Sequence, residues 1–205
     1  MIRSESVEHV STLRRTLYHF PIIHTSVDMG ALSETIRRSA LQEMGEAAWK
    51  RKVAVIDRTW TDIEGFIETL RLSFEAVRLY QDGLPVCGRE VEIVRELAGH
   101  GSRNHRLLLR LAERGAAVMG TESPELLVEE YELTKKLLEG WNSPTDGDSP
   151  QGLSERVLAR RDHFIAQRIN GTLRPGETGL LFLGMLHTVE NLLDEDIRVI
   201  PVQPT

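Results

Sequence analysis

The chain has 205 residues, which suits a single domain and is long enough to bury a sizeable core. Its composition is that of an ordinary globular protein, but only 5% of its residues are aromatic, so we expect an aliphatic core. The formal net charge of -6 gives no electrostatic support for binding nucleic acid. Cys87 is the one cysteine of the chain, which excludes an intrachain disulfide and Cys-based zinc sites.

No targeting or membrane signal is evident in the sequence. The first residues, Met1–Glu5, contain no apolar signal core. No apolar run approaches the roughly 20 residues that a membrane span requires. We therefore expect a cytoplasmic protein whose partners include neither a membrane nor nucleic acid.

Short apolar runs alternate with segments of helical periodicity along the chain. The runs that predict buried strands lie at 18–24, 79–85, 116–122, 180–184 and 197–202. Helical segments are predicted from Ser33 onward and at 89–98, 104–114, 123–140, 154–173 and 188–193. This order predicts one α/β domain over residues 1–205, with a mostly parallel sheet of about five strands flanked by helices. The turn-rich segment 142–153 is predicted to be a mobile surface loop.

The strongest periodic signal is a heptad pattern that predicts a long helical arm over residues 34–78. Its apolar residues are spaced alternately four and three apart: Trp49, Val53, Ile56, Trp60, Ile63, Ile67, Leu70, Phe74 and Val77. Such a seam needs a long partner helix. The partner is either segment 34–48 folded back as a hairpin or the same helix of a second chain. We expect a homo-oligomer that associates through residues 49–77; the alternative is a purely structural arm.

Polar side chains follow the predicted strands directly. His24 and Asp28 come after the first strand, and Asp82, Glu122 and His187 come at or after the ends of three others. In open parallel sheets, ligands bind beyond the carboxyl ends of the strands. The sequence therefore predicts that these side chains share one edge of the sheet.

Each of these residues also has a purely structural interpretation. His24 can be a satisfied core histidine, and Asp28 can cap a turn before a glycine. Asp82 begins an Asp-Gly pair that is common in turns. Glu122 suits the positive end of the following helix, and His187 can cap the short helix after it.

Arg161 lies on the apolar side of its predicted helix, four residues before Ile165. An inward-facing arginine usually pairs with a carboxylate or binds an anionic group. We expect its guanidinium near Glu122 or near a bound anion; an internal salt bridge to Glu122 is the structural alternative.

Four short patches of the chain resemble a known family. Gly184-Met185-Leu186-His187 after a buried strand resembles the GxxH motif of the TraB/TIKI group, which is distantly linked to erythromycin-esterase-like proteins. That family has another GxxH on its first strand, where this chain reads Pro21-Ile22-Ile23-His24, with proline in place of glycine. Glu122 resembles the family's acidic residue, and Arg161-Asp162 followed by Ile165-Ala166 resembles its Arg-Asp helix. The resemblance implies hydrolysis of an amide or ester bond, with a divalent metal in some members.

A metal site at this edge would be chemically coherent with that implication. Two histidines and a glutamate, His24, Glu122 and His187, are ligand types that hold zinc, manganese or cobalt and leave positions open for water. Without a metal, a histidine would act as the general base and Arg161 would stabilise the developing oxyanion. Asp28 and Asp82 are the candidate substrate-binding residues.

The leading hypothesis is a small cytoplasmic hydrolase that acts on a small-molecule or peptide substrate. One alternative is a non-catalytic module that uses the same edge to bind a small anionic ligand. Another is an assembly subunit that acts through the helical arm.

Overall fold

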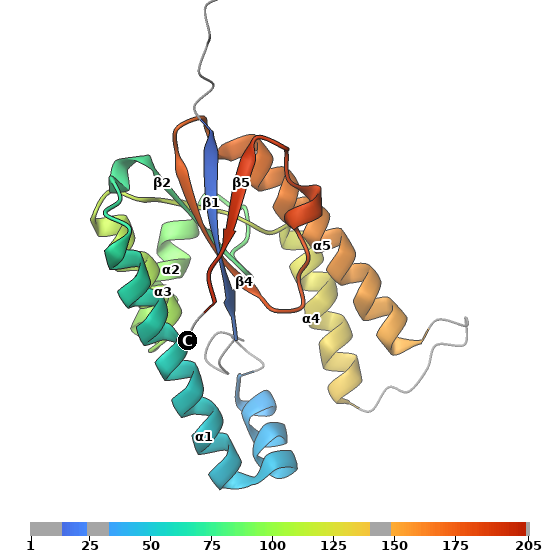
Figure 1. Ribbon diagram of the computed structural model, residues 1–205. Helices are drawn as coiled ribbons and strands as arrows, with labels where there is room; N and C mark the ends of the chain where they lie inside the picture. Colours follow the sequence, from blue (N-terminus) through green and yellow to red (C-terminus); the bar gives the residue numbers. More distant parts are fainter. Residues whose placement is uncertain (1–13, 24–32, 140–148, 204–205) are drawn as a thin grey trace, which may run out of the picture.

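In a computed structural model of the chain, the structure describes residues 14–23, 33–139 and 149–203 (Figure 1). The described residues form a five-stranded sheet in the order β3-β2-β4-β1-β5, and every strand pair in it is parallel. The strands are β1 (Arg15–Ile22), β2 (Val77–Gln81), β3 (Ala117–Met119), β4 (Thr178–Gly184) and β5 (Ile197–Pro201). The predicted α/β class and mostly parallel sheet are confirmed.

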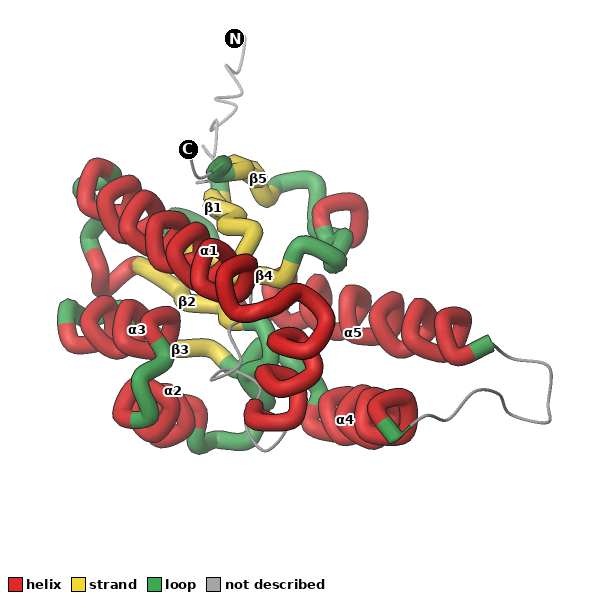
Figure 2. The backbone as a smooth tube through the Cα atoms, turned by 90° about the horizontal axis from the view of Figure 1, so that it is seen from below, coloured by secondary structure: helices red, strands yellow, loops and turns green. Residues whose placement is uncertain are grey.

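Helices cover both faces of this sheet. They are α1 (Ser33–Thr69), α2 (Glu90–Gly99), α3 (Arg103–Glu113), α4 (Pro124–Leu138) and α5 (Pro150–Thr172), with short 3-10 turns η2 (Phe74–Ala76) and η3 (Glu190–Leu192). Figures 1 and 2 show α1, α2 and α3 on one side of the sheet and α5, with α4 beside it, on the other. Ser123 caps the amino terminus of α4 as expected, because its side chain accepts a hydrogen bond from the Leu126 N–H and Pro124 is the first helical residue.

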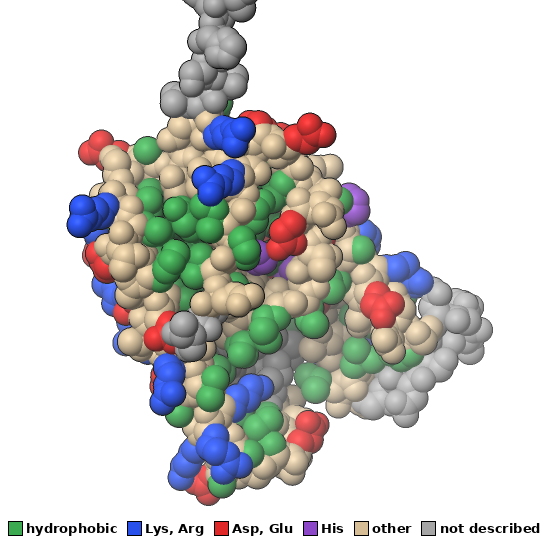
Figure 3. Space-filling model, viewed as in Figure 1, with side chains coloured by type: hydrophobic (Ala, Val, Ile, Leu, Met, Phe, Trp, Pro, Cys, Tyr) green, Lys and Arg blue, Asp and Glu red, His purple; other side chains and the backbone are tan. Residues whose placement is uncertain are grey.

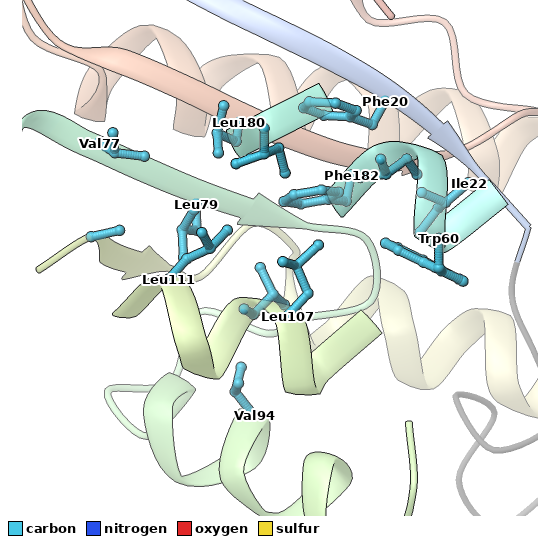
Figure 4. Close-up of a cluster of buried hydrophobic side chains, with 14 of the residues drawn as sticks. Phe20, Ile22, Trp60, Val77, Leu79, Val94, Leu107, Leu111, Leu180 and Phe182 are labelled. Carbon is cyan, nitrogen blue, oxygen red and sulfur yellow. The ribbon is translucent and has the colours of Figure 1, made fainter. Parts of the chain in front are cut away.

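The larger part of the core lies between the sheet and helices α1 to α3. Alternate strand residues such as Phe20, Leu79 and Phe182 face this side, and Trp60 of α1 packs with its ring centroid 6.1 Å from that of Phe182 (Figure 4). The opposite strand residues, among them Leu17 and Leu181, pack against Ile165, Ile169 and other side chains of α5. The two-residue period of the strands thus sends neighbouring side chains into two separate apolar layers.

The prediction of a helical arm over residues 34–78 is wrong at its carboxyl-terminal end. Helix α1 ends at Thr69, whereas Phe74 lies in η2 and Val77 begins β2. The middle of the heptad seam, Ile56 to Ile67, is buried in the core of its own chain. This part of the seam therefore packs against the sheet and α3 of its own chain. Earlier on the seam, Trp49 and Val53 line a hollow together with Arg37 and Leu41 of the first part of α1. A heptad pattern and the apolar face of a core-packed helix are hard to distinguish over a few turns, because their periods are 3.5 and 3.6 residues.

Two further boundaries differ from expectation. Helix α1 has a non-helical residue, Gly45, with φ of 75°, so its first three turns form a separate segment. Residues 150–153, predicted to be loop, are the first turn of α5, which is capped by Ser149. The rest of the predicted mobile loop lies outside the described residues apart from Ser149, which is the α5 cap.

Candidate functional site

Among the described residues, these buried charged or titratable side chains meet at the carboxyl edge of the sheet: Asp82, Glu122, Arg161, Asp162 and His187. We call them the carboxyl-edge cluster. They come from three strand ends and from α5, because in a parallel sheet the carboxyl ends of β2, β3 and β4 lie side by side.

Asp82 is held by the tight turn that ends β2. The Leu84 N–H donates to the carbonyl of Gln81, and Gly83 supplies the positive φ of 75° that the turn requires. The expected Asp-Gly turn is therefore present, and it also aims the carboxylate inward. Oδ2 of Asp82 accepts a hydrogen bond from the Gly184 N–H at 2.8 Å, which ties the end of β2 to the end of β4.

Glu122 follows β3, and its backbone is fastened to the loop after β2. The amides of Thr121 and Glu122 both donate to the carbonyl of Leu84, and the Val86 N–H donates to the carbonyl of Glu122. The Glu122 side chain is 0% exposed. A carboxylate buried this deeply requires a cationic partner or a proton.

Arg161 is that partner, which confirms the expected contact between the two residues. Its Nε and Nη2 lie 3.2 and 2.7 Å from the two Glu122 oxygens, and Nη2 also donates to Oδ1 of Asp82 at 2.8 Å. Nη1 donates to Glu130 of α4 at 2.6 Å. All three nitrogens of the guanidinium are thus engaged by carboxylates, so Arg161 holds Asp82 and Glu122 together.

His187 is positioned by the sharp turn at the end of β4, in which its own N–H donates to the carbonyl of Gly184 at 3.1 Å. Its Nδ1 lies 2.5 Å from Oδ1 of Asp162, and its Nε2 lies 3.5 Å from Oδ2 of Asp82. The other oxygen of Asp162 accepts from the N–H of Thr188 at 3.0 Å. Asp162 therefore fixes the orientation of the ring and directs Nε2 at the cluster.

Burial and charge pairing shift the pKa values of these groups in different directions. Burial favours neutral His187, but its hydrogen bonds to Asp162 and Asp82 outweigh that effect and raise its pKa to about 9. Burial raises the pKa of Glu122 despite the opposing effect of Arg161. Burial also acts to raise the pKa of Asp162, yet its hydrogen bonds from His187 and Thr188 bring that pKa below its usual range.

One ligand atom from each of Asp82, Glu122 and His187 lies within 4.8 Å of the others, so this buried group can hold a metal ion. Asp82, predicted to bind substrate at the margin, thus stands among the possible metal ligands beside the predicted Glu122 and His187. His24 and Asp28 lie outside the described residues. Strand β1 itself ends at Ile22, two residues before the predicted end.

Asp162 is the member of the cluster that we did not predict as a site residue from the sequence. It lies three residues before Ile165 and four before Ala166, on the buried side of α5. An acidic residue in an apolar stripe was therefore a usable signal. The sequence analysis also did not single out Glu130. This residue is half-buried and follows the exposed Glu129, so in sequence it looks like part of a solvent-facing acidic pair.

Searches against protein-family models, curated proteins and solved structures found no match to this chain.

On the face shown in Figure 3, hydrophobic side chains form patches, and acidic and basic side chains lie mostly near the outline. Among the described residues, no helix combines the length and apolar character that a membrane span requires.

Proposed function

We propose that this chain is a small hydrolase that cleaves an amide or ester bond at a divalent-cation centre formed by Asp82, Glu122 and His187. The observation that carries the proposal is the meeting of these three buried ligands within 4.8 Å, with the second ring nitrogen of His187 held by Asp162. Carboxylate–histidine pairs of this kind orient metal-binding imidazoles in many proteins.

The spacing of the ligands suits a first-row divalent ion. Two ligand atoms at ~2.1 Å from a tetrahedral ion lie ~3.4 Å apart. Oδ2 of Asp82 and Nε2 of His187 are separated by 3.5 Å, so these two residues need little movement to share an ion. Two carboxylates and one imidazole suit zinc, manganese or cobalt.

The charge of the cluster supports the same proposal. The carboxylates of Asp82 and Glu122 pair with the guanidinium of Arg161, and Glu130 reaches it from the half-exposed margin. The third buried carboxylate, Asp162, pairs with His187. With His187 protonated, as its raised pKa of about 9 implies at neutral pH, the three buried carboxylates exceed the two cations by one negative charge, and the excess becomes two when His187 gives up its proton to act as a metal ligand. A divalent cation would balance this excess, which is costly to leave buried.

Each residue of the cluster has a distinct task in this proposal. A bound cation would supply Lewis acidity, polarising a carbonyl and lowering the pKa of a water molecule. Asp162 keeps Nε2 of His187 directed at the ion position. Arg161 holds Asp82 and Glu122 side by side against their mutual repulsion, because both carboxylates bond to the same Nη2. This task differs from the oxyanion stabilisation predicted for Arg161.

The alternative of a non-catalytic module for a small anionic ligand has less support. An anion would need a cationic group to receive it, and Arg161 already bonds to Asp82, Glu122 and Glu130 through all three nitrogens. The second cationic group, protonated His187, already pairs with Asp162 and Asp82. An anion at this position would also face the remaining carboxylates.

The proposal is tested by metal content and hydrolysis together. Protein dialysed with zinc, manganese or cobalt is analysed by plasma mass spectrometry, and hydrolysis of p-nitrophenyl esters and p-nitroanilides is measured. We expect one ion per chain, with hydrolysis that a chelator removes and the metal restores. His187→Ala and Glu122→Gln should both lose the ion.

A matched control is His163→Ala, because His163 lies on the same helix as Arg161 but is exposed, and its Nδ1 pairs with the carbonyl of Ala159. This variant should keep both metal and activity. Wild-type protein that takes up no ion, or that hydrolyses its substrates equally well in chelator, would contradict the proposed metal centre.

A further inference from the structure

Two large apolar side chains stand in solvent directly beside the carboxyl-edge cluster. Met185 is 65% exposed and Leu186 is 79% exposed, although the strand residues Leu180 to Leu183 before them are fully buried. His187, the next residue, is only 8% exposed. The turn that brings His187 inward therefore places its two predecessors outward.

The turn that follows β4 lies close to the carboxyl-edge cluster. Strand β4 lies between β2 and β1 in the sheet, so the turn lies near the middle of the carboxyl edge. The Gly184 N–H donates to Oδ2 of Asp82, which joins the turn to the cluster through a direct hydrogen bond. Among the described residues, Met185 and Leu186 are thus the exposed large apolar side chains nearest in sequence to the candidate reacting centre.

The neighbouring loop after β2 is also without charge. Residues 83–88 read Gly-Leu-Pro-Val-Cys-Gly, with Leu84 buried and Pro85 and Val86 half-buried. Strands β2 and β4 pair directly, so this loop and the Met185–Leu186 turn follow adjacent strands. Two uncharged loops therefore border a cluster made of charged groups.

We propose that Met185 and Leu186 bind an apolar acyl chain of the substrate, so that the enzyme prefers esters or amides of longer acyl groups to those of acetate. This inference rests on the proposed hydrolase function. A polar reacting centre bordered by apolar side chains suits a substrate whose scissile carbonyl carries a hydrocarbon chain. Covering Met185 and Leu186 with that chain would remove apolar surface from water and favour binding.

The test compares p-nitrophenyl hexanoate with p-nitrophenyl acetate on wild-type protein and on Met185→Gln/Leu186→Gln. Each methylene moved out of water favours binding by ~fourfold, so partial cover of the four additional methylenes predicts a kcat/KM ratio of about tenfold or more. The double variant should lower that ratio severalfold, chiefly through KM. Val55→Gln is the matched control, because Val55 is 58% exposed on α1 and should leave the ratio unchanged.

Binding is measured separately from turnover by titrating hexanamide and acetamide calorimetrically. Tighter binding of hexanamide that the double variant abolishes supports the acyl site, even if no ester is hydrolysed; in that case only the proposed hydrolysis fails. Equal affinity for the two amides in wild-type protein overturns the acyl site, whatever the activity.

A second copy of the chain is the competing occupant of this surface. Light scattering at the assay concentration distinguishes it. A dimer that Met185→Gln/Leu186→Gln dissociates, with the acyl preference unaltered, would overturn the proposal in favour of a self-association surface. Both positions are exposed, so the variant is expected to fold, and its circular dichroism is compared with that of wild type.

Discussion

Asp162 contributes to the site through His187 rather than by direct contact with an ion. Replacing it with Asn removes the negative charge behind the imidazole and weakens control of its tautomer. We expect Asp162→Asn to reduce metal affinity by about 10- to 100-fold while the fold is retained. Affinity is measured by competition with a chromophoric chelator. Asp57→Asn, at an exposed position on α1, should bind as tightly as wild type.

The neighbouring residues Arg161 and Arg160 form a buried and an exposed ion pair, so the same substitution at each position compares the stability that the two kinds of pair contribute. Arg161→Lys removes the planar fork that bonds both Glu122 oxygens, and leaving that buried carboxylate poorly paired should cost about 3–5 kcal/mol. Arg160 pairs with Glu129 at the surface, so Arg160→Lys should change stability by less than ~1 kcal/mol. Urea unfolding measures both. Equal small effects would show that Arg161 is not needed to balance the cluster.

Tyr80, which packs in the apolar layer between the sheet and α5, should make the free energy of unfolding depend on pH. Burial raises its pKa to about 12, and its hydroxyl lies 2.9 Å from Thr172. Since the unfolded tyrosine ionises near pH ~10, the stabilising contribution of Tyr80 is present below that pH and is lost as pH rises through about 12. Tyr80→Phe should therefore be less stable than wild type at pH 8, and the difference should shrink or reverse by pH 11. A difference that stays constant in urea unfolding at both pH values would argue against this.

At the scale of the element, helix α1 shows how one apolar stripe serves the core. Trp60 is 2% exposed and packs near Phe182, whereas Val53, two turns earlier on the same predicted seam, is 39% exposed. Trp60→Ala should cost about 3–5 kcal/mol. Val53→Ala should stay within ~0.5 kcal/mol. If Val53→Ala proved comparably destabilising, a partner covering the first half of the seam would be indicated, as the predicted homo-oligomer requires.

At the scale of the whole molecule, metal binding should stabilise the fold because the three ligands come from three separate strand ends. At a free metal concentration 100 times Kd, the stabilisation is about 2.7 kcal/mol. For a chain of this size, that corresponds to a rise in Tm of roughly 5–10 °C. Differential scanning calorimetry with and without manganese measures the shift. His187→Ala should show none, and an equal shift in that variant would place the ion elsewhere.

The amino-acid pattern alone determined the fold class and most of the elements. Alternation of apolar runs with helical periodicity is local information, and it was sufficient to predict a parallel sheet with both faces covered. The rule that strand carboxyl ends share an edge then brought Glu122 and His187 into one predicted site, and the position of Arg161 on the apolar side of its helix predicted its contact with Glu122. The same local information could not separate a coiled-coil seam from a core-facing stripe, so the end of α1 was misplaced beyond Thr69.

Only the tertiary structure decided which side chains meet and in what state of charge. The strand order placed β2 between β3 and β4, which brought Asp82 from the predicted margin into the possible metal-ligand group. The packing of α5 brings Asp162 within hydrogen-bond distance of His187, and it places every guanidinium nitrogen of Arg161 against a carboxylate. These outcomes depend on distances between segments far apart in sequence. A one-dimensional pattern can indicate that a residue is buried, but the partner that compensates its charge is chosen by the way the elements pack.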